Sequence, residues 1–362
     1  MRRTSDDDGV NAPIDRDLLR RLPKAELHCH LDGSVRPSTL IELGQEQGIA
    51  MPRGTAEELR DYMLVSDARN LEEYLERFDV TLSVMQTESA LERVAYELAL
   101  DAADEGVRYI EVRYSPVLNI RGGLELGAAV EAPLRGLARA ERERGVLGRV
   151  IVCGIRNMDP AVSLELARLA VQYRKRGVVG FDLAGGEQAN PASQHAAAFF
   201  HAREHDLACT CHAGEGDGAD SVRQAVHVCG AHRLGHATRL IEDESLTEYV
   251  NDRRIALEIC LTSNVQTRAA RSYAAHPFRE YFDRGLNVVL NTDNRLMSGT
   301  TLTDEYAHAA AHLDFTFEEL CTVALNGFES GFLPWEERVA LIAAARAEMA
   351  ALRAPAADGA AA

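Results

Sequence analysis

The sequence predicts an α/β fold: a (β/α)8 TIM barrel with a helical insertion after the first strand and extra helices near the C-terminal end. Eight short strand-like runs alternate with amphipathic helical stretches along the 362 residues. Glycine follows a charged helix end at Glu105-Gly106, Arg176-Gly177 and Arg284-Gly285, where its left-handed conformation suits a helix stop. Strand–helix alternation repeated eight times is typical of a closed parallel barrel.

The elements follow from local periodicity and from the breaks between periodic segments. The expected strands cover, in order, residues 25–30, 107–114, 149–155, 178–183, 207–212, 233–236, 255–261 and 286–292. The expected helices with the clearest apolar spacing cover residues 71–85, 90–105, 126–144, 161–176, 191–205 and 335–353.

The repeat is uneven after the first strand, because a mostly helical stretch separates it from the second. In a barrel, an insertion at this point lies over the C-terminal mouth, so we expect it to roof a pocket. Residues 316–353 read as helices that close the barrel. The predicted organisation is a disordered tail over 1–15, one metal-dependent hydrolase barrel domain over 16–353 with its helical insertion at 34–105, and a disordered tail over 354–362.

The amino-acid composition argues against two classes of partner, nucleic acids and membranes. The formal net charge of −17 disfavours attraction to phosphate backbones, so we expect no nucleic acid partner. We also expect no membrane partner, because no apolar run approaches spanning length and the N-terminal residues lack a signal-peptide core. Seven cysteines with no regular spacing indicate reduced thiols and a cytoplasmic location.

Ionisable residues gather where the expected strands end. His28 and His30 share one face of the first strand, because alternate residues of a strand point the same way. His212, His236 and Asp293 end the fifth, sixth and eighth strands. In a barrel these ends meet at one mouth. Three histidines and one carboxylate, from the first, fifth and eighth strands, suit a single zinc-type ion with room for water.

The same set supplies groups that can move protons. A bound metal lowers the pKa of its water toward neutrality, which provides hydroxide at physiological pH. Glu215, three residues after His212, and His236 remain free to act as general acid or base. Asp293 can both bind the ion and accept a hydrogen bond from the nucleophilic water. The pattern therefore predicts hydrolysis of an amide, ester or amidine.

In these segments the chain resembles the adenosine deaminase family of the amidohydrolase superfamily, across roughly residues 18–352. The matching motifs are Pro-Lys-Ala-Glu-Leu-His-Cys-His-Leu-Asp-Gly (23–33), Glu-Val-Arg-Tyr-Ser-Pro (111–116), Gly-Phe-Asp-Leu-Ala-Gly (180–185), His-Ala-Gly-Glu (212–215), Leu-Gly-His (234–236) and Asn-Thr-Asp (291–293). The resemblance implies hydrolytic deamination of adenosine and 2′-deoxyadenosine to inosine, 2′-deoxyinosine and ammonia, through attack of metal-bound hydroxide at purine C6.

The resemblance also implies residue roles. The ligands of one Zn2+ per subunit would be His28, His30, His212 and Asp293. Glu215 would protonate purine N1, and His236 would orient and deprotonate the zinc-bound water, with Asp293 as the third catalytic residue.

The substrate contacts that the resemblance implies come from His30, Asp32, Gly185 and Asn294. Asp32 would contact a ribose hydroxyl, and Gly185 would offer its backbone N–H to purine N3. Asn294 departs from the family pattern, because many members carry a second Asp that contacts purine N7. An amide NH2 donates at any pH, so Asn294 can do the same job, although the change leaves purine specificity open.

Other interpretations remain. The pair His201 and His205, and the pair His308 and His312, have helical metal spacing, but we expect solvated helix faces there. The fourth strand ends without the Lys of binuclear barrel hydrolases, which favours one metal. Alternative functions are deamination of a modified adenine nucleoside such as aminodeoxyfutalosine, and non-catalytic nucleoside binding on the same fold. The expected partner is a small purine nucleoside, and the oligomeric state is left open.

Overall fold

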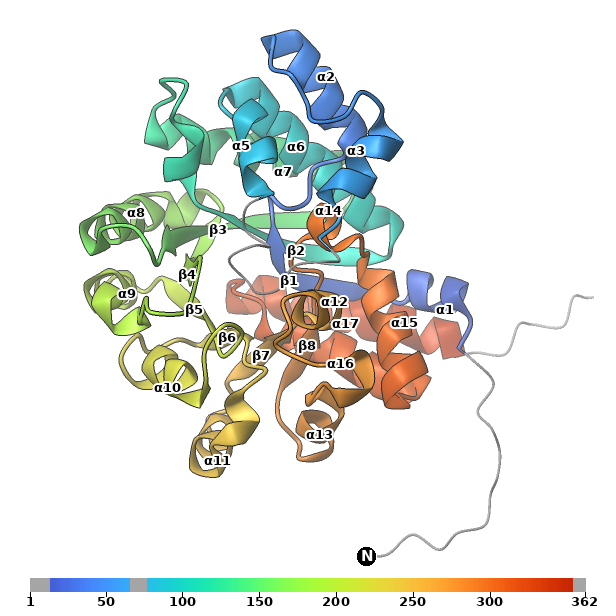
Figure 1. Cartoon of the computed structure of the whole chain (residues 1–362). Coiled ribbons are helices and arrows are strands. Elements are labelled where there is room, and N and C mark those ends of the chain that lie inside the picture. Colours follow the sequence, from blue (N-terminus) through green and yellow to red (C-terminus); the bar gives the residue numbers. More distant parts are fainter. Residues whose placement is uncertain (1–13, 66–76, 354–362) are drawn as a thin grey trace, which may run out of the picture.

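The eight predicted strands form one closed barrel. The computed structural model describes residues 14–65 and 77–353. All strands run parallel in the order β1-β2-β3-β4-β5-β6-β7-β8 (Figure 1). Backbone hydrogen bonds from His30 N to Asp293 O (2.7 Å) and from Asp293 N to His28 O (2.9 Å) join the first strand to the segment after the last. The (β/α)8 prediction is therefore confirmed.

The bounds of β1 to β6 lie within two residues of the expected ones, whereas β7 and β8 are shorter than expected. Their bounds are β1 Lys24–His30, β2 Val107–Tyr114, β3 Leu147–Ile155, β4 Val178–Ala184, β5 Ala208–Ala213, β6 Arg233–His236, β7 Ala256–Ile259 and β8 Val288–Leu290.

Strands β7 and β8 are shorter than predicted, because their last expected residues leave the ladder. Residue Leu261 already begins a helix, α12 (Leu261–Gln266). After β8, Asn291 N still donates to Ile259 O on β7 (2.8 Å), but toward β1 its side chain replaces the backbone ladder: its Oδ1 accepts hydrogen bonds from Leu27 N (2.7 Å) and His28 N (3.1 Å). The apolar pattern could not distinguish these residues from true strand residues.

Helices surround the barrel (Figure 1). Those between β2 and β7 are α7 Leu126–Arg144, α8 Pro160–Tyr173, α9 Ala196–Glu204, α10 Ala219–His227 and α11 Glu244–Asp252. Those elsewhere in the ring or at its rim are α1 Arg16–Arg21, α13 Phe278–Asp283, α14 Arg295–Ser298, α15 Leu302–Leu313, α16 Phe317–Ser330 and α17 Trp335–Arg353. The helices expected at 161–176 and 191–205 are present, with 3-10 turns at Arg174–Arg176 and Ala192–His195.

The segment between β1 and β2 folds into helices on one side of the molecule, drawn in blue and cyan in Figure 1. They are α2 Pro37–Gln47, α3 Ala56–Met63, α5 Phe78–Val84 and α6 Glu88–Asp104. The helix expected over 71–85 is observed in its C-terminal part as α5. Its first residues, 71–76, lie outside the described residues, as do most of the tail expected over 1–15 and all of that over 354–362.

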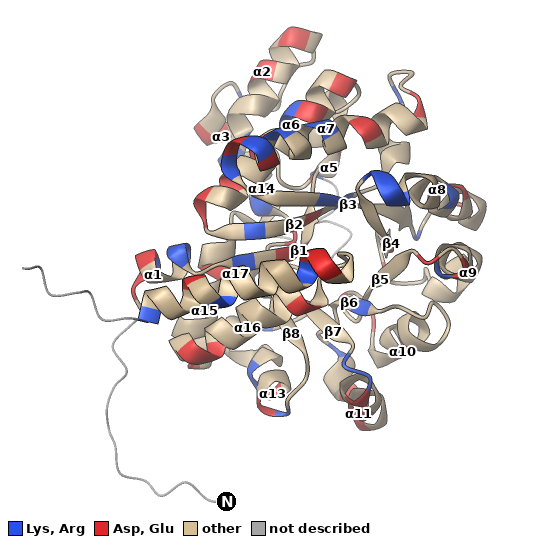
Figure 2. Cartoon of the chain, turned by 180° about the vertical axis from the view of Figure 1, so that it is seen from behind, with Lys and Arg blue, Asp and Glu red and all other residues tan. Residues whose placement is uncertain are grey.

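Charged residues of both signs are intermixed along the outer helices in Figure 2. Several pair across neighbouring helices, for example Arg135 with Glu88 and Glu92 on α6, at 2.8 Å each. Within the described part of the chain, no helix combines the length and apolarity needed to cross a membrane.

Candidate active site

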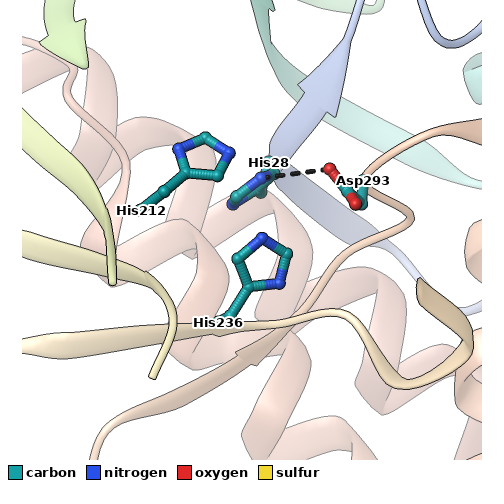
Figure 3. A group of neighbouring side chains, drawn as sticks. All are labelled: His28, His212, His236 and Asp293. Atoms are coloured by element: carbon teal, nitrogen blue, oxygen red, sulfur yellow. Dashed lines mark ion pairs between the residues drawn. The ribbon is translucent and has the colours of Figure 1, made fainter. Parts of the chain in front are cut away.

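Side chains from the ends of four strands meet at the mouth of the barrel. The predicted residues His28, His212, His236 and Asp293 are all buried, and each offers a ligand atom within 4.8 Å of the others. Figure 3 shows His28 between the rings of His212 and His236 and the carboxylate of Asp293. The remaining predicted ligand, His30, joins them, since its Nε2 lies 3.1 Å from His212 Nε2.

The ligand-type atoms face one another across this cluster. The Oδ1 atom of Asp293 lies 3.3 Å from His28 Nε2 and 3.4 Å from His30 Nε2. The second oxygen of Asp293, Oδ2, accepts a hydrogen bond from Ser263 Oγ at 2.7 Å. Burial acts to raise the pKa of Asp293, but the surrounding histidines, His28 first, hold that pKa well below the usual range. Asp293 is therefore an ionised carboxylate with one oxygen directed at the histidines.

Two buried carboxylates fix the orientation of two histidine rings. His28 Nδ1 lies 2.9 Å from Glu258 Oε2, and His212 Nδ1 lies 3.0 Å from Asp182 Oδ2. Both carboxylates accept hydrogen bonds only, so in the neutral rings that a metal ion binds each Nδ1 carries the proton and each Nε2 presents a lone pair to the cluster. His28 Nε2 is buried without a hydrogen-bond partner among the residues that the structure describes. Lone-pair nitrogens beside an ionised carboxylate fit a divalent cation.

The orienting carboxylates belong to a charge network in the barrel interior. Arg113 donates to Asp182 at 3.0 Å and to Glu258 at 2.9 Å, and Arg233 donates to Glu258 at 2.6 Å. All four side chains are buried. Their roles were not predicted from the sequence. A signal was present for the two carboxylates, because Asp182 and Glu258 are the charged residues of otherwise apolar strands, as in Phe-Asp-Leu and Leu-Glu-Ile.

Backbone strain accompanies two of the site residues. His236 has a φ of 62° and Asp293 a φ of 61°, both in the left-handed region that non-glycine residues rarely adopt. Each lies where a strand gives way to a loop, and each directs its side chain into the cluster. Strain of this kind persists where surrounding contacts fix the conformation, and it concentrates at functional sites.

The predicted acid, Glu215, lies beside the cluster. Its Oε2 is 3.4 Å from His236 Nε2, and its Oε1 accepts a hydrogen bond from Thr267 Oγ1 at 3.0 Å. Burial, followed by the negative charge of Asp293, raises the pKa of Glu215 well above its usual range. An upward shift of this kind favours the protonated carboxyl group, which can donate its proton.

A second glutamate, which the sequence analysis did not single out, anchors the segment that carries Glu215. The buried carboxylate of Glu187 accepts four backbone N–H groups. They belong to Gly214 (2.7 Å), Glu215 (3.0 Å), Gly216 (2.7 Å) and Asp217 (3.2 Å). Glu187 follows the strand-four motif by two residues, but its contact depends on a loop conformation that the sequence pattern does not specify.

A cavity of about 340 Å³ opens onto these groups, a size suited to a small ligand. Its lining comprises His30, Asp32, Phe78, Asp79, Leu82, Leu118, Arg121, Ile155, Asn157, Met158, Ala184, Gly185, His212, Glu215, His236, Asp293 and Asn294. Helix α5 contributes three of these residues, so part of the segment between β1 and β2 lies over the cavity. The wall therefore combines apolar side chains with the polar cluster.

The predicted substrate-contacting residues all line this cavity. Asp32 Oδ1 and Asn294 Oδ1 are buried without hydrogen-bond partners in the described part of the chain, and burial raises the pKa of Asp32 to about 7. Gly185 has a φ of 97°, which a residue with a side chain adopts only under strain. Gly33 lies so close to Asn294 that a Cβ at position 33 would be 1.8 Å from Asn294 Oδ1.

The other histidine pairs lie apart from this site. His201 on the outer helix α9 and the C-cap residue His205 have ring centroids 4.2 Å apart at a tilt of 40°, and Glu204 beside them is exposed. His308 and His312 on α15 stack against Tyr273, with centroids 4.3 and 5.0 Å from its ring. These contacts explain both pairs as helix-face packing.

This chain is similar to known proteins over most of its length. The family model described as adenosine deaminase matches residues 23–347. A relative named adenosine deaminase 1, from Streptomyces coelicolor, is 42% identical over 342 residues, covering 90% of this chain and 86% of the relative.

Two solved structures share the fold. The adenine deaminase from Arthrobacter aurescens has a TM-score of 0.84 at 28% identity, covering 91% of this chain and 99% of that one. A zinc-bound amidohydrolase from Burkholderia ambifaria has a TM-score of 0.85 at 26% identity, covering 95% of each chain.

Proposed function

This chain belongs to the adenosine deaminase family, as the match over residues 23–347 shows, and we propose that it hydrolyses adenosine and 2′-deoxyadenosine to inosine and 2′-deoxyinosine. Water adds to purine C6, the bond from C6 to the exocyclic nitrogen breaks, and ammonia leaves. The family assignment makes the protein a hydrolase that acts on a carbon–nitrogen bond of a cyclic amidine.

One observation carries this proposal: two carboxyl groups whose pKa values are displaced in opposite directions line the same cavity. Burial raises the pKa of Glu215 and favours its protonated form, whereas the surrounding histidines, His28 first, hold the pKa of Asp293 low and favour its carboxylate. A ring nitrogen of the substrate needs a proton donor to make the adjacent carbon electrophilic, and the attacking water needs an acceptor. Two carboxyl groups whose pKa values are displaced in opposite directions supply both functions.

The residues fit the zinc that the family uses. We propose that His28, His30, His212 and Asp293 hold one ion, since Glu258 and Asp182 keep the Nε2 lone pairs of His28 and His212 directed at the cluster. When bound, zinc supplies a Lewis acid that makes water nucleophilic near neutral pH. The zinc-bound amidohydrolase among the structural neighbours supports this assignment.

The chain's own residues would position the nucleoside. Glu215 donates its proton to purine N1, with Thr267 holding the other carboxyl oxygen. The backbone N–H of Gly185 is available to purine N3, and the Asn294 amide to purine N7. Asp32 offers its unpaired oxygen to a ribose hydroxyl. His236 and Asp293 flank the face from which water attacks.

The proposal extends to the cellular setting. All seven cysteines are free and buried, which is compatible with a reducing compartment, so we propose a cytoplasmic enzyme of purine metabolism. The acidic chain and the small cavity support a nucleoside as the substrate.

The substitution Glu215→Gln tests the function. Glutamine keeps the shape of the side chain but carries no acidic proton, so kcat for adenosine should fall by about 10²- to 10⁴-fold, whereas calorimetric binding of inosine should persist. Unchanged turnover would contradict the role of Glu215. The wild-type zinc-loaded protein should be assayed on adenosine, 2′-deoxyadenosine, adenine, AMP and aminodeoxyfutalosine, with mass identification of each product. Turnover restricted to a substrate other than the two nucleosides would contradict the proposed specificity.

A further inference from the structure

Behind the His236 ring lies a chain of three hydrogen bonds that ends on a backbone amide. His236 Nδ1 lies 2.9 Å from Asn264 Nδ2. Asn264 Oδ1 lies 3.1 Å from His276 Nε2. His276 Nδ1 lies 3.1 Å from the backbone nitrogen of Phe278. The side chains of His236, Asn264 and His276 are all buried, so water does not substitute for any of these contacts.

The donor and the acceptor of each hydrogen bond in this chain follow from its last member, the backbone N–H of Phe278. A backbone N–H donates and never accepts, so His276 Nδ1 is an acceptor and carries no proton. Burial lowers the pKa of His276 to about 3, so the ring is neutral at neutral pH and its single proton is on Nε2. That proton is donated to Asn264, and the atom that receives it must be the carbonyl oxygen. The hydroxyl of Thr238 donates to the same oxygen at 3.1 Å.

With its oxygen turned toward His276, Asn264 presents its NH2 group to His236. An amide NH2 only donates, so His236 Nδ1 must accept and must lack a proton. The opposite amide orientation would place NH2 against the N–H donor of His276 Nε2. The doubly protonated His236 ring is excluded as well, since its Nδ1–H would point at another donor.

We propose, on the basis of the deaminase function above, that Asn264 and His276 act as positioning residues that lock neutral His236 in the tautomer with its proton on Nε2. In this state His236 donates a hydrogen bond into the site, toward the oxygen that adds to C6, and does not take a proton from it at Nε2.

This assignment also separates His236 from the metal ligands. His28, His30, His212 and His236 all approach the same point, but the first and third present Nε2 lone pairs, whereas Nε2 of His236 bears hydrogen. A protonated ring nitrogen cannot bind a metal. The assignment therefore leaves His30, and not His236, as the third histidine available to zinc.

The direct test is the tautomer itself. Long-range ¹H–¹⁵N correlation spectra of the zinc-loaded, ¹⁵N-histidine-labelled protein distinguish a protonated from an unprotonated ring nitrogen, and the His236→Gln variant identifies the His236 signals by their loss. We expect an unprotonated Nδ1 and a protonated Nε2. A His236 ring with its proton on Nδ1 would overturn the proposal whether or not the protein turns over adenosine. Conversely, an Nε2 proton in a protein without deaminase activity would refute the function and leave the tautomer assignment standing.

The substitution Asn264→Asp is designed to invert the tautomer. A carboxylate accepts but does not donate, so His236 should move its proton to Nδ1, while the donors His276 and Thr238 keep an acceptor. We expect kcat for adenosine to fall on the order of 10²-fold, the effect of losing one positioned donor, with a smaller change in KM. The matched variant His276→Gln keeps an NH2 group facing the Asn264 oxygen and should retain the wild-type tautomer. An Nε2 proton and full turnover in Asn264→Asp would refute the relay.

Zinc content gives a readout that does not depend on turnover. The His236→Gln variant should retain one zinc per chain by elemental analysis, whereas His30→Gln should lose it. Zinc lost from His236→Gln and retained by His30→Gln would overturn the exclusion of His236 from the ligand set.

Discussion

Removing the carboxylate of Glu187 should misplace the catalytic acid although Glu187 itself does not line the cavity. Its oxygens hold the backbone of residues 214–217 through four N–H groups. The substitution Glu187→Gln replaces one of these oxygens with an NH2 group. If the remaining oxygen keeps the three amides that Oε2 binds, the N–H of Gly214 faces a donor in a buried position.

The expected loss of stability and of kcat follows from the single N–H group that loses its acceptor. One buried N–H left without an acceptor costs about 1–3 kcal/mol, and a middle value of about 2 kcal/mol corresponds to about 30-fold in a rate constant. We therefore expect Glu187→Gln to lower the free energy of unfolding by about 2 kcal/mol and kcat for adenosine by roughly 10- to 30-fold. The variant Glu187→Asp keeps both oxygens on a shorter side chain and should fall between Gln and wild type.

Urea denaturation and steady-state kinetics measure the two effects separately. A matched control is Glu319→Gln, because Glu319 also accepts a backbone N–H, that of Thr316 at 2.9 Å, in the capping box that begins α16. The control should lose stability but keep kcat. Wild-type kcat in Glu187→Gln, or an equal loss of kcat in Glu319→Gln, would refute the claim that Glu187 acts by holding the Glu215 segment.

Three further predictions concern the metal, acid stability and the cavity wall. Chelation should abolish deamination and added zinc should restore it; full activity in a verified metal-free sample would contradict the proposed centre. The pKa of His276 is about 3 in the folded state against 6.5 for a free ring, so the unfolded chain binds more protons between these values and stability is lost as pH falls through this window. At pH 5 the loss is about 2 kcal/mol, and His276→Gln should remove that share of the pH dependence in urea titrations at pH 5 and 7.5; an unaltered pH dependence would contradict it. Gly33→Ala should displace the Asn294 side chain, since its Cβ would lie 1.8 Å from Asn294 Oδ1, and raise KM for adenosine several-fold; a wild-type KM would show that Asn294 does not bind the base.

The parts of this protein that the sequence predicted are those that depend on periodicity and on barrel topology. Eight strand runs were visible because their apolar residues are contiguous, and a parallel barrel brings all strand ends to one mouth. For that reason His28, His212 and Asp293, which are far apart in the sequence, could be expected to meet. The lengths of β7 and β8 were overestimated, because a helix begins at Leu261 and because toward β1 the Asn291 side chain replaces the backbone ladder, neither of which the pattern of residue types reveals.

The parts that the sequence did not predict depend on which atom faces which. Glu187 and Asn264 have no distinctive spacing. The loop after β4 brings the Glu187 carboxylate to four backbone amides, and helix α12 brings the Asn264 amide to one imidazole nitrogen. A residue type limits what a side chain can donate or accept, but only the three-dimensional contacts identify its partner. The tautomer of His236 is an example, since it follows from the N–H of Phe278 through two intervening side chains.

The buried charge network below the site also acts by fixing which atoms face one another, and burying its charges costs free energy. Arg113, Asp182 and Glu258 are fully buried, and apolar residues of similar volume are often as stable as, or more stable than, buried ion pairs. Stability alone therefore does not explain their presence. An apolar side chain at position 182 or 258 would leave the Nδ1–H of His212 or His28 without an acceptor and the ring free to turn. Arg113 holds both carboxylates in place at once, so the two histidines are oriented as a pair. The network is best understood as the support that keeps the Nε2 lone pairs of His28 and His212 directed at one point.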